Sequence, residues 1–554
     1  MVLRLFIVAA LLSALPLGAL AAPEIDYARV VEHSATEALV RQSSFTKEYW
    51  WRCSFQTRAC AAADENTLVA APEPVPPFML AYRALLPAGA GSLHRSPDGR
   101  YIAFYVPATQ TRNTRTFGVM DTTDLSVYTK TETVSYWDLL TEGVNRYYHF
   151  SPDSKTLLYI DDVRDHPTLY RVDMDALGSL GNVLPSERLF SREYSVADVV
   201  WKDTDSIFYV ANRDNPYAWG LYELDIETYS LKKLADNVSY ADTMWRLPAQ
   251  AGNGEKLLFA ESDERGVRPA LYNLATGAVE HFALPKKEAL ATDGQVVTTL
   301  KAGLSGVFLL EESGWSDTLV VWLHGGPYRQ AATSYHPFLS YGGYDWVLER
   351  MRQADVGVLK LDYPGSFGFG REFAESITGG IGTVDADAAA AAIADFAARN
   401  SYKEVYLMGN SYGGYLALKL LVDHPGRYKG ALSINGVADW LTLLTKLDTS
   451  IFNVQFGGTV DDANRQMYQN ASIYNYTDRL GAQKVVLVHG ERDTTVPVSQ
   501  SEGLATYLSL IGKRVRLITI PNEDHVYKKP ESFETLCGAA LALVVKADAS
   551  PCTL

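Results

Sequence analysis

The stretch YLMGNSYGGYLAL, residues 406–418, decides the fold of this chain. Residues 406–408 are apolar and predict a buried strand, and the end of the stretch predicts a helix. Between them, residues 409–413 read GNSYG and match the G-x-S-x-G pattern of a nucleophile elbow. Glycines stand on both sides of the serine because a side chain there would clash in so sharp a turn. The pattern therefore predicts that Ser411 is a nucleophile at a helix N-terminus, where free N–H groups favour negative charge.

Around the elbow, from about residue 291 onward, apolar strand candidates alternate with helical patterns. The strand candidates are residues 296–302, 306–312, 317–324, 356–362, 405–409, 430–436, 484–490 and 514–520. The clearest helix candidate is residues 385–399, which are rich in alanine, acidic at the start and basic at the end. This alternation predicts a doubly wound α/β domain over residues 291–554. In such a domain, sites form at the carboxyl ends of the strands.

A different repeat precedes this domain, in residues 81–290. Turn sequences at 96–100 (SPDGR), 151–155 (SPDSK), 203–206 (DTDS) and 253–256 (NGEK) each stand before a short apolar strand. Their spacing of about 50 residues is the size of one propeller blade, and hairpin patterns lie between them. We expect a small all-β propeller of about four to five blades here; an unrelated β-sandwich is the alternative.

The N-terminus has the pattern of a secretory signal peptide. Arg4 supplies a basic start, residues 5–20 are apolar, and residues 19–21 form an A-x-A cleavage site. The alternative interpretation is a membrane anchor. The stretch is short for a membrane span and is interrupted by Pro16, which argues against this alternative. We therefore expect residues 1–21 to be removed and the mature protein to be exported, either to a periplasm or into the medium.

Residues 22–80 have no single pattern and are expected to form an N-terminal segment and linker. Residues 24–42 are compatible with a helix. Residues 70–77 are rich in proline and predict an extended linker.

The chain has four cysteines, and an even number in an exported protein indicates disulfides. Local pairing, Cys53 with Cys60 and Cys537 with Cys552, is the simplest of three connectivities; free thiols are the alternative. No C-x-x-C motif occurs and no histidine stands at ligand spacing, so we expect no metal site.

Composition and charge limit the classes of partner. The length of 554 residues predicts two or more domains, and 47% hydrophobic with 21% charged residues is typical of soluble proteins. The net charge of −15 argues against nucleic acid, and against an anionic membrane after signal removal. Whether the protein is a monomer or a dimer stays open.

A serine nucleophile needs a base and an orienting acid, which follow it in the order Asp, then His, in α/β-hydrolases. Residues 489–497 (HGERDTTVP) follow a buried strand and place Asp493 on a strand-end loop. Residues 521–525 (PNEDH) follow the next strand and place His525 on another. We predict that His525 takes the Ser411 proton and that Asp493 stabilises the resulting imidazolium.

Other ionisable residues near these motifs are assigned structural roles. His489 directly follows an apolar strand and is interpreted as a structural histidine at the edge of the core. Glu491, Glu523 and Asp524 are interpreted as solvated loop charges and not as the triad acid.

The oxyanion of the tetrahedral intermediate needs hydrogen-bond donors. One is the N–H of Tyr412, the residue after the nucleophile. The second is expected from residues 323–328 (LHGGPY), which follow an early strand. We favour the N–H of Gly326, with Gly325 or His324 as alternatives.

Together these motifs resemble the catalytic domain of the prolyl oligopeptidase family of serine peptidases. The resemblance covers about residues 317–545 and is carried by HGGP (324–327), LDYPGSFGFGREF (361–373), GNSYGGYLAL (409–418), HPGRYKGALSINGVADW (424–440), HGERDTTVPVSQSEGL (489–504) and PNEDHVY (521–527). The acylaminoacyl-peptidase and dipeptidyl-peptidase-like branches are the most similar. The α/β domain after a propeller is the arrangement of that family.

The resemblance implies a function without cofactor or metal. Ser411, Asp493 and His525 would hydrolyse peptide bonds through an acyl-enzyme, and the propeller would admit oligopeptides but not folded proteins. A carboxylesterase on the same scaffold is the first alternative, since the triad chemistry is identical. A non-enzymatic propeller binding protein is the second, but it would have a broken site.

The resemblance also implies a substrate pocket and shows two departures, of which one is a propeller region shorter than the seven or eight blades usual in the family. Tyr412, Val437 and Trp440 would line the pocket for the side chain before the scissile bond; core packing is the alternative for the latter two. Residues 362–366 read DYPGS where the family often has NYRGS, so the interactions of this loop stay open.

Overall fold

The computed structural model describes most of the chain. The described residues are 26–34, 36–43, 48–67, 82–107, 114–133, 148–161, 167–190, 194–240, 242–247, 249, 254–263, 266–284, 297–301, 308–312, 317–331, 336, 339–446, 452, 455–456, 460–461, 463–544 and 552. The expected signal peptide, the expected linker at 70–77 and the expected boundary at 290/291 lie outside these residues.

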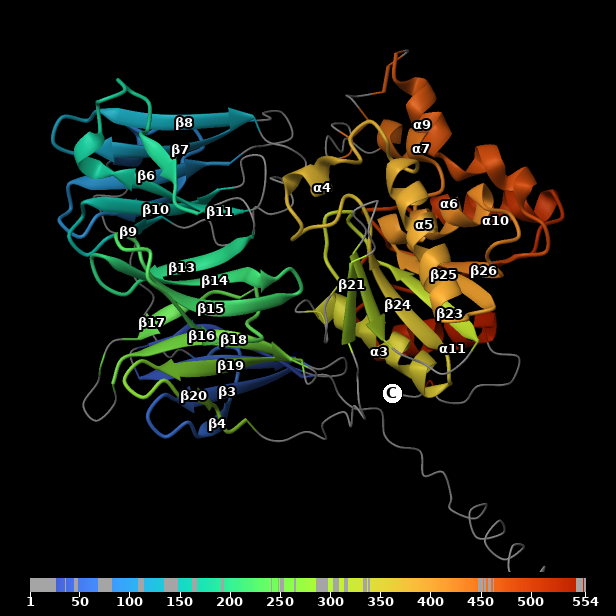
Figure 1. Cartoon of the computed structure of the whole chain (residues 1–554), viewed down its shortest axis with the longest axis horizontal. Helices are drawn as coiled ribbons and strands as arrows, with labels where there is room; N and C mark the ends of the chain where they lie inside the picture. The colour runs from blue at the N-terminus through green and yellow to red at the C-terminus, as the bar shows by residue number, and fades with distance from the viewer. Residues whose placement is uncertain are drawn as a thin grey trace, which may run out of the picture.

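The N-terminal half is built of small antiparallel sheets, on one side of the molecule in Figure 1. Its strands are β1 (Asp26–His33), β2 (Glu37–Ser43), β3 (Glu48–Ser54), β4 (Cys60–Ala63), β5 (Gly91–Arg95), β6 (Tyr101–Val106), β7 (Thr114–Asp121), β8 (Val127–Thr133), β9 (His149–Phe150), β10 (Thr156–Asp161), β11 (Thr168–Asp173), β12 (Ser186–Arg188), β13 (Val196–Trp201), β14 (Ser206–Asn215), β15 (Ala218–Asp225), β16 (Leu231–Ala235), β17 (Trp245–Leu247), β18 (Lys256–Asp263), β19 (Gly266–Asn273) and β20 (Val279–His281). Strands β5–β8, β9–β12 and β13–β16 each form a four-stranded sheet. The groups β1–β4 and β17–β20 share one sheet through the parallel pair β1–β19. The described strands thus form five groups of four, as expected for a small propeller.

The first two turns of the predicted repeat, at residues 96–100 and 151–155, have the same hydrogen bonds. The Ser96 hydroxyl bonds Asp98 Oδ1 at 2.6 Å, and the Tyr101 N–H donates to Ser96 Oγ at 2.9 Å. The Ser151 hydroxyl bonds Asp153 Oδ1, also at 2.6 Å. The two S-P-D sequences therefore build the same turn before β6 and before β10.

The helix expected for residues 24–42 is wrong, because the described residues of this segment form β1 and β2. The two strands pair antiparallel, and Val40 of β2 stands opposite Trp51 of β3. Val40 is fully buried in a small apolar cluster of this sheet. Burial against neighbouring strands outweighs local helix propensity here, as tertiary context often does.

The C-terminal half is built around one eight-stranded sheet, whose strands are ordered β21-β22-β24-β23-β25-β26-β27-β28. Its strands are β21 (Val297–Lys301), β22 (Phe308–Glu312), β23 (Thr318–Leu323), β24 (Gly357–Asp362), β25 (Glu404–Asn410), β26 (Gly430–Ile434), β27 (Lys484–Gly490) and β28 (Val515–Ile520). β22 runs antiparallel to β21 and β24, and the strands from β24 to β28 are mutually parallel. The parallel strands read as apolar runs because both faces of the sheet are covered.

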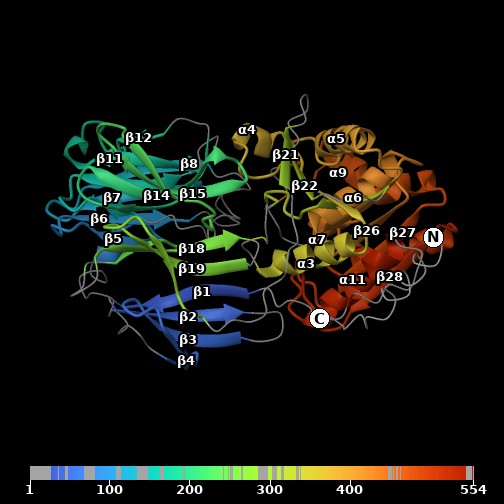
Figure 2. The same ribbon diagram turned by 60° about the horizontal axis from the view of Figure 1, so that its bottom comes forward.

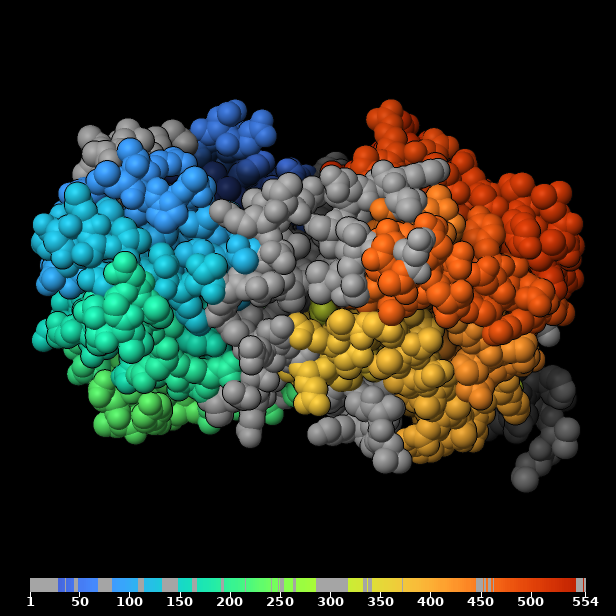
Figure 3. All heavy atoms as spheres, turned by 90° about the horizontal axis from the view of Figure 1, so that it is seen from above, coloured from blue at the N-terminus to red at the C-terminus, as the bar shows by residue number. Residues whose placement is uncertain are grey.

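Helices cover the two faces of this sheet, as Figure 2 shows. They are α3 (Leu339–Gln353), α4 (Arg371–Glu375), α5 (Val384–Arg399), α6 (Tyr412–Asp423), α7 (Trp440–Lys446), α9 (Arg465–Ala471), α10 (Ser499–Leu510) and α11 (Pro530–Val544). One apolar cluster joins alternate strand residues to α5, α6 and α10, and a second joins the other face to α3 and α11. The predicted doubly wound α/β domain and the predicted helix at 385–399 are confirmed. Figure 3 shows the propeller and this domain as neighbouring lobes.

Candidate active site

Ser411 lies on a sharp turn between β25 and α6. Its φ is 54° and its ψ is −119°, a conformation that a residue with a side chain adopts only under strain. The Ser411 N–H donates to the Ile434 carbonyl of the neighbouring strand at 2.7 Å. The serine thus stands at the carboxyl end of the sheet and at the first turn of α6.

The glycines of the elbow are required by close backbone contacts. A Cβ on Gly413 would overlap the carbonyl oxygens of Leu323 and His324, and one on Gly409 would overlap the carbonyl of Gly413. The elbow is therefore packed directly against the end of β23, from which the HGGP loop begins. This is the reason that the sequence pattern keeps both glycines.

The three residues predicted as a triad lie together in the order that the chemistry requires. His525 Nε2 is 2.9 Å from Ser411 Oγ, and His525 Nδ1 is 2.7 Å from Asp493 Oδ2. Asp493 lies on the loop after β27, and His525 on the loop after β28. The arrangement allows His525 to accept a proton from Ser411 while its other nitrogen is held by Asp493.

Asp493 is held in its ionised form. Its Oδ1 accepts the N–H groups of Thr495 and Val496, at 2.9 and 2.7 Å. Burial on its own raises the pKa of Asp493, but hydrogen bonds from His489, His525 and the Val496 N–H outweigh this effect and lower the pKa to about 2. The carboxylate therefore keeps its charge across the physiological pH range.

His489 is buried and contacts the candidate triad acid, a contact that the sequence analysis missed. Its Nδ1 lies 2.7 Å from Ser501 Oγ, and its Nε2 lies 2.8 Å from the Val496 carbonyl and 3.3 Å from Asp493 Oδ2. His489 is a buried residue at the end of β27, as expected, and it also contacts Asp493. No local pattern signals this contact, because it depends on how the loop after β27 folds back.

Glu523, expected to be a solvated loop charge, is 2% exposed, so this interpretation was wrong. Its carboxylate accepts hydrogen bonds from the N–H of Lys528, the N–H of Lys529 and the hydroxyl of Ser532. These donors lie at or just before the start of α11, where a negative charge is favoured. Glu523 thereby ties the loop that carries His525 to this helix.

The HGGP loop lies beside the elbow. A cis peptide joins Gly326 to Pro327, and Gly326 has a φ of 124°, which favours glycine. A Cβ on Gly325 would stand 2.9 Å from the Tyr341 hydroxyl and 3.1 Å from the Asn410 side chain. Tyr341 is a further residue of this site that sequence reasoning missed. The roles of Gly326 and Tyr412 as oxyanion donors stay predictions.

The predicted pocket residues lie within one aromatic cluster. Tyr412, Val437 and Trp440 are 1, 2 and 0% exposed, and the rings of Tyr412 and Trp440 are 5.9 Å apart. The Tyr412 hydroxyl donates to Asp385 Oδ2 at 2.7 Å, and burial raises the pKa of Asp385 to about 6. In the sequence, Asp385 indicates only the acidic start of a helix. The role of the three residues in substrate binding stays a prediction.

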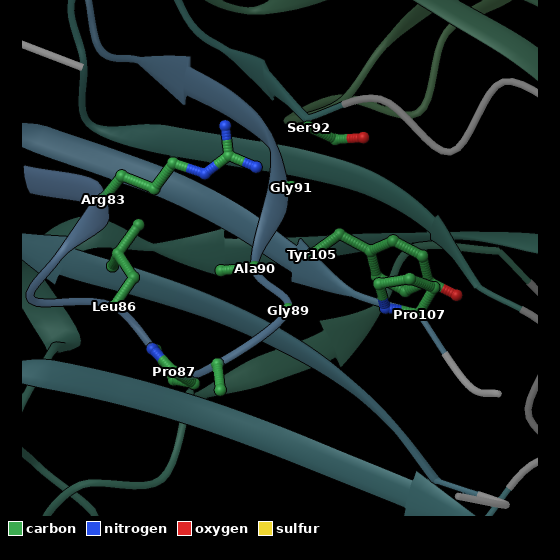
Figure 4. A pocket seen from close by; sticks show the side chains of 10 residues that line it. Arg83, Leu86, Pro87, Gly89, Ala90, Gly91, Ser92, Tyr105 and Pro107 are labelled. Atoms are coloured by element: carbon green, nitrogen blue, oxygen red, sulfur yellow. The ribbon is translucent and has the colours of Figure 1, made fainter. Parts of the chain in front are cut away.

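Two cavities lie away from Ser411. The cavity of about 470 Å³ in Figure 4 lies in the propeller and is lined by Arg83, residues 86–92, Tyr105 and Pro107. The other, of about 590 Å³, lies between α4 and the first turns of α5. Neither is lined by a residue of the candidate triad.

The described part of the chain has neither a metal-binding cluster nor a membrane-spanning helix. No group of three His, Cys, Asp or Glu side chains in it is arranged to hold a metal ion. No helix in it has both the length and the apolar character needed to cross a membrane.

The two disulfides are Cys53–Cys60 and Cys537–Cys552, so the expected local pairing is confirmed.

Comparison with known sequences indicates the family to which the catalytic domain is similar. Residues 343–544 match the pattern described as the prolyl oligopeptidase family, Peptidase_S9. Acylamino-acid-releasing enzyme 1 of Oryza sativa is 23% identical over 346 residues, which is 59% of this chain and 42% of that protein. The dipeptidyl aminopeptidase BIII of Pseudoxanthomonas mexicana is 27% identical over 224 residues, 39% of this chain and 31% of that protein. The chain thus spans less than half the length of these curated relatives.

Comparison with solved structures extends the likeness to nearly the whole chain. A puromycin-hydrolyzing peptidase of Mycobacterium tuberculosis superposes with a TM-score of 0.63 at 18% identity, over 93% of this chain and 78% of that one. A Pyrococcus horikoshii acylaminoacyl peptidase superposes with a TM-score of 0.57 at 14% identity, over 95% and 97%. At such identities the likeness establishes the fold, a propeller followed by an α/β-hydrolase domain.

Proposed function

Because the chain belongs to the prolyl oligopeptidase family of serine peptidases, we propose that it hydrolyses peptide bonds of oligopeptides through an acyl-enzyme on Ser411. The observation that carries the proposal is the line of contacts at 2.9 and 2.7 Å that joins Ser411 Oγ, His525 and Asp493. These distances are those of a nucleophile, its base and an orienting acid.

The proposed reaction has two halves. In the first, Ser411 Oγ attacks the carbonyl carbon while its proton moves to His525 Nε2, and that proton then passes to the leaving amine. In the second, water attacks the acyl-enzyme, His525 takes a proton from the water, and Ser411 regains its hydrogen as the new carboxylic acid leaves. Asp493 stabilises the imidazolium in both halves and stays ionised.

The developing oxyanion is stabilised by two backbone donors, one at the start of α6 and one in the HGGP loop after β23. We assign the Tyr412 N–H and the Gly326 N–H to this role. The contact of Gly413 with the end of β23 supports the assignment, because it holds the HGGP loop against the elbow. The helix dipole of α6 adds a partial positive charge at the same place.

The substrate class is supported by the relatives and by the fold. Related proteins are described as acylamino-acid-releasing enzymes and dipeptidyl peptidases. A propeller beside the catalytic domain favours chains short enough to pass it. We propose Tyr412, Val437 and Trp440 as walls of the pocket for the residue before the cut.

The proposal is tested with a panel of chromogenic oligopeptides, with free and blocked amino termini, varied at the residue before the cut. We expect turnover by the wild type and none by Ser411→Ala, while both proteins melt at the same temperature. Equal turnover by Ser411→Ala would overturn the assignment. Hydrolysis of aryl esters but of no peptide would show instead a carboxylesterase on this scaffold.

We further propose that the protein is exported after removal of residues 1–21. Two disulfides support this, because such bonds persist in oxidising compartments. Expression of the full chain followed by N-terminal sequencing of the secreted or periplasmic product tests it. A product that begins at residue 22 is expected; an intact N-terminus on a cytosolic protein would refute it.

A further inference from the structure

Asn435 lies at the carboxyl end of β26, between the strands that lead to the candidate triad. In the sheet, β26 stands between β25, which ends at the elbow, and β27, which precedes Asp493; β28, which precedes His525, lies beyond β27 (Figure 2). Asn435 directly follows Ile434, the last residue of β26, and is 1% exposed. Its φ of 48° lies in the left-handed region, which asparagine tolerates better than most residues with a side chain. The end of β26 is therefore placed to contact the loops on both sides.

The side-chain amide of Asn435 makes three hydrogen bonds. Its Nδ2 donates to the His525 carbonyl at 2.8 Å. Its Oδ1 accepts the Gly490 N–H at 3.0 Å and the Tyr527 hydroxyl at 2.9 Å. The orientation of the amide is fixed by its backbone partners, because a carbonyl can only accept and an N–H can only donate. Asn435 thus joins the loop of His525 to the end of β27.

Backbone contacts connect the same corner of the sheet to the other two members of the candidate triad. The Ile434 carbonyl, next to Asn435, accepts the Ser411 N–H at 2.7 Å. Gly490, whose N–H is bound by the Asn435 side chain, accepts the Asp493 N–H on its carbonyl at 3.2 Å. The end of β26 therefore contacts the chain segments that carry all three residues of the candidate triad.

The loop that carries His525 is packed closely against the end of β27. A Cβ on Gly490 would stand 2.6 Å from the Glu523 carbonyl oxygen and 2.7 Å from that of Asp524. The His525 N–H donates to Asp524 Oδ1 at 2.7 Å, which is a contact within the loop. The contact of the His525 carbonyl with Asn435 instead crosses to another strand. It therefore holds the backbone of His525 in place relative to the sheet.

We propose that Asn435 is a positioning residue of the active site: its side chain fixes the backbone of His525, so that the imidazole stays aligned with Ser411 Oγ. The proposal rests on the proposed function for its catalytic part. The distances of 2.9 and 2.7 Å at the two ring nitrogens leave little room for a shift of this backbone, and a misplacement of about 1 Å can cost ~100-fold in rate. Tyr527 acts through Asn435, because its hydroxyl holds the amide in place.

The contact is tested without activity by hydrogen–deuterium exchange of the peptide that contains residues 521–528. Asn435→Gly removes the side chain, and glycine accepts a φ of 48° without strain. We expect these amides to exchange about fivefold faster than in the wild type, the factor expected for the loss of one hydrogen bond. The matched control is Asn237→Gly, since Asn237 is an exposed asparagine of the propeller with a φ of 56°. It is expected to exchange at 521–528 as the wild type does.

The catalytic part is tested by the kinetics of the same variants on a peptide that the wild type cuts. We expect kcat to fall about tenfold in Asn435→Gly with KM changed less than about twofold, because the base is displaced and the substrate contacts are not. A loss of stability alone would leave the kcat of the folded protein unchanged. Asn237→Gly is expected to keep the kcat of the wild type.

A second variant isolates the hydroxyl that holds the amide. Tyr527→Phe keeps the ring and removes only the donor to Asn435 Oδ1. We expect kcat to fall about threefold in this variant, less than in Asn435→Gly, because the bond to the His525 carbonyl remains. In the Asn435→Gly background, the further change Tyr527→Phe is expected to have little effect on kcat, since its partner is already absent.

Each outcome decides one part. Unchanged exchange at 521–528 in Asn435→Gly would overturn the positioning role, whatever the activity. Faster exchange with unchanged kcat would overturn its catalytic part. If Asn435→Gly does not fold, an unchanged kcat in Tyr527→Phe overturns the proposal. Effects of the two substitutions that simply add would show that Tyr527 does not act through Asn435. A wild type that cuts no peptide, together with the expected exchange pattern, would refute the proposed function and support the contact.

Discussion

His489 and Asp493 are in contact beneath the candidate triad: the imidazole Nε2 lies 3.3 Å from Oδ2, the oxygen that also faces His525. His489 is itself anchored by Ser501, 2.7 Å from its Nδ1. The candidate acid is therefore held from two sides. The line of contacts runs from Ser411 through His525 and Asp493 to His489.

We expect His489→Leu to lower kcat about tenfold and leave KM almost unchanged, because Asp493 loses one of the donors that orient it. The reduction is far below the ~10⁴-fold expected when the acid itself is removed. His489→Gln keeps a donor and should restore part of kcat. Steady-state kinetics on one peptide measure this, with His424→Gln, a histidine at the end of α6, as a neutral control. Full activity of His489→Leu would contradict the role.

The depressed pKa of Asp493 predicts a stability that is lost in acid. Its pKa of about 2 in the folded state lies below the ordinary value of 3.8, so the ionised form stabilises the fold above pH 4. This contribution, about 2 kcal/mol, disappears as the pH falls from about 4 to about 2. Denaturant unfolding of the wild type and Asp493→Asn at several pH values measures it. A stability difference that does not shrink below pH 4 would be incompatible with the assignment.

The raised pKa of Asp385 predicts the opposite trend. Its folded-state pKa of about 6 lies above the ordinary value of 3.8, so stability is highest below pH 4 and falls as the pH rises through 6. Asp385→Asn cannot ionise at this position. The free energy of unfolding of this variant, relative to that of the wild type, should therefore rise by about 3 kcal/mol between pH 4 and pH 7. The same unfolding series checks this. A difference in the free energy of unfolding that stays constant with pH would rule out a raised pKa for the buried Asp385 carboxyl.

Gly413→Ala should prevent the elbow from forming. The added Cβ meets the carbonyl oxygens of Leu323 and His324, which are backbone atoms and cannot move aside. We expect a loss of at least about 3 kcal/mol in the free energy of unfolding, together with loss of activity.

Gly538→Ala is the matched control for this change. Gly538 lies in α11, and a Cβ there meets no atom within 4 Å. Because alanine is the better helix former, this variant should be stabilised by about 0.5–1 kcal/mol. Equal effects of the two substitutions would show that the close packing at Gly413 is not what constrains the elbow.

Local patterns in the sequence predicted the catalytic domain well. The elbow around Ser411, the apolar parallel strands and the order of the motifs with Asp493 and His525 each depend on short stretches with a defined spacing. The turn repeat with Ser96 and Ser151 depends on hydrogen bonds of the serine side chain within each turn. For this reason the fold class could be read before the structure was known.

Contacts between distant residues could not be predicted in the same way. The local pattern of residues 24–42 is compatible with a helix. The described residues form strands instead because they pair with β3 and β19, which lie elsewhere in the chain. Glu523 looked solvated because its partners belong to the start of α11. The Pro216 carbonyl accepts a hydrogen bond from Gln330 Nε2 across the domain interface, and neither residue stands in a pattern that points to the other.

The central claim is that Ser411 is the nucleophile and His525 its base. The most direct measurement is to treat the protein with a peptidyl diphenyl phosphonate, find the modified residue by peptide mapping, and compare the modification rate with that of His525→Ala. We predict one modification, on Ser411, and a rate at least about 100-fold lower in His525→Ala. Modification of another residue, or an equal rate in the two proteins, would contradict the account.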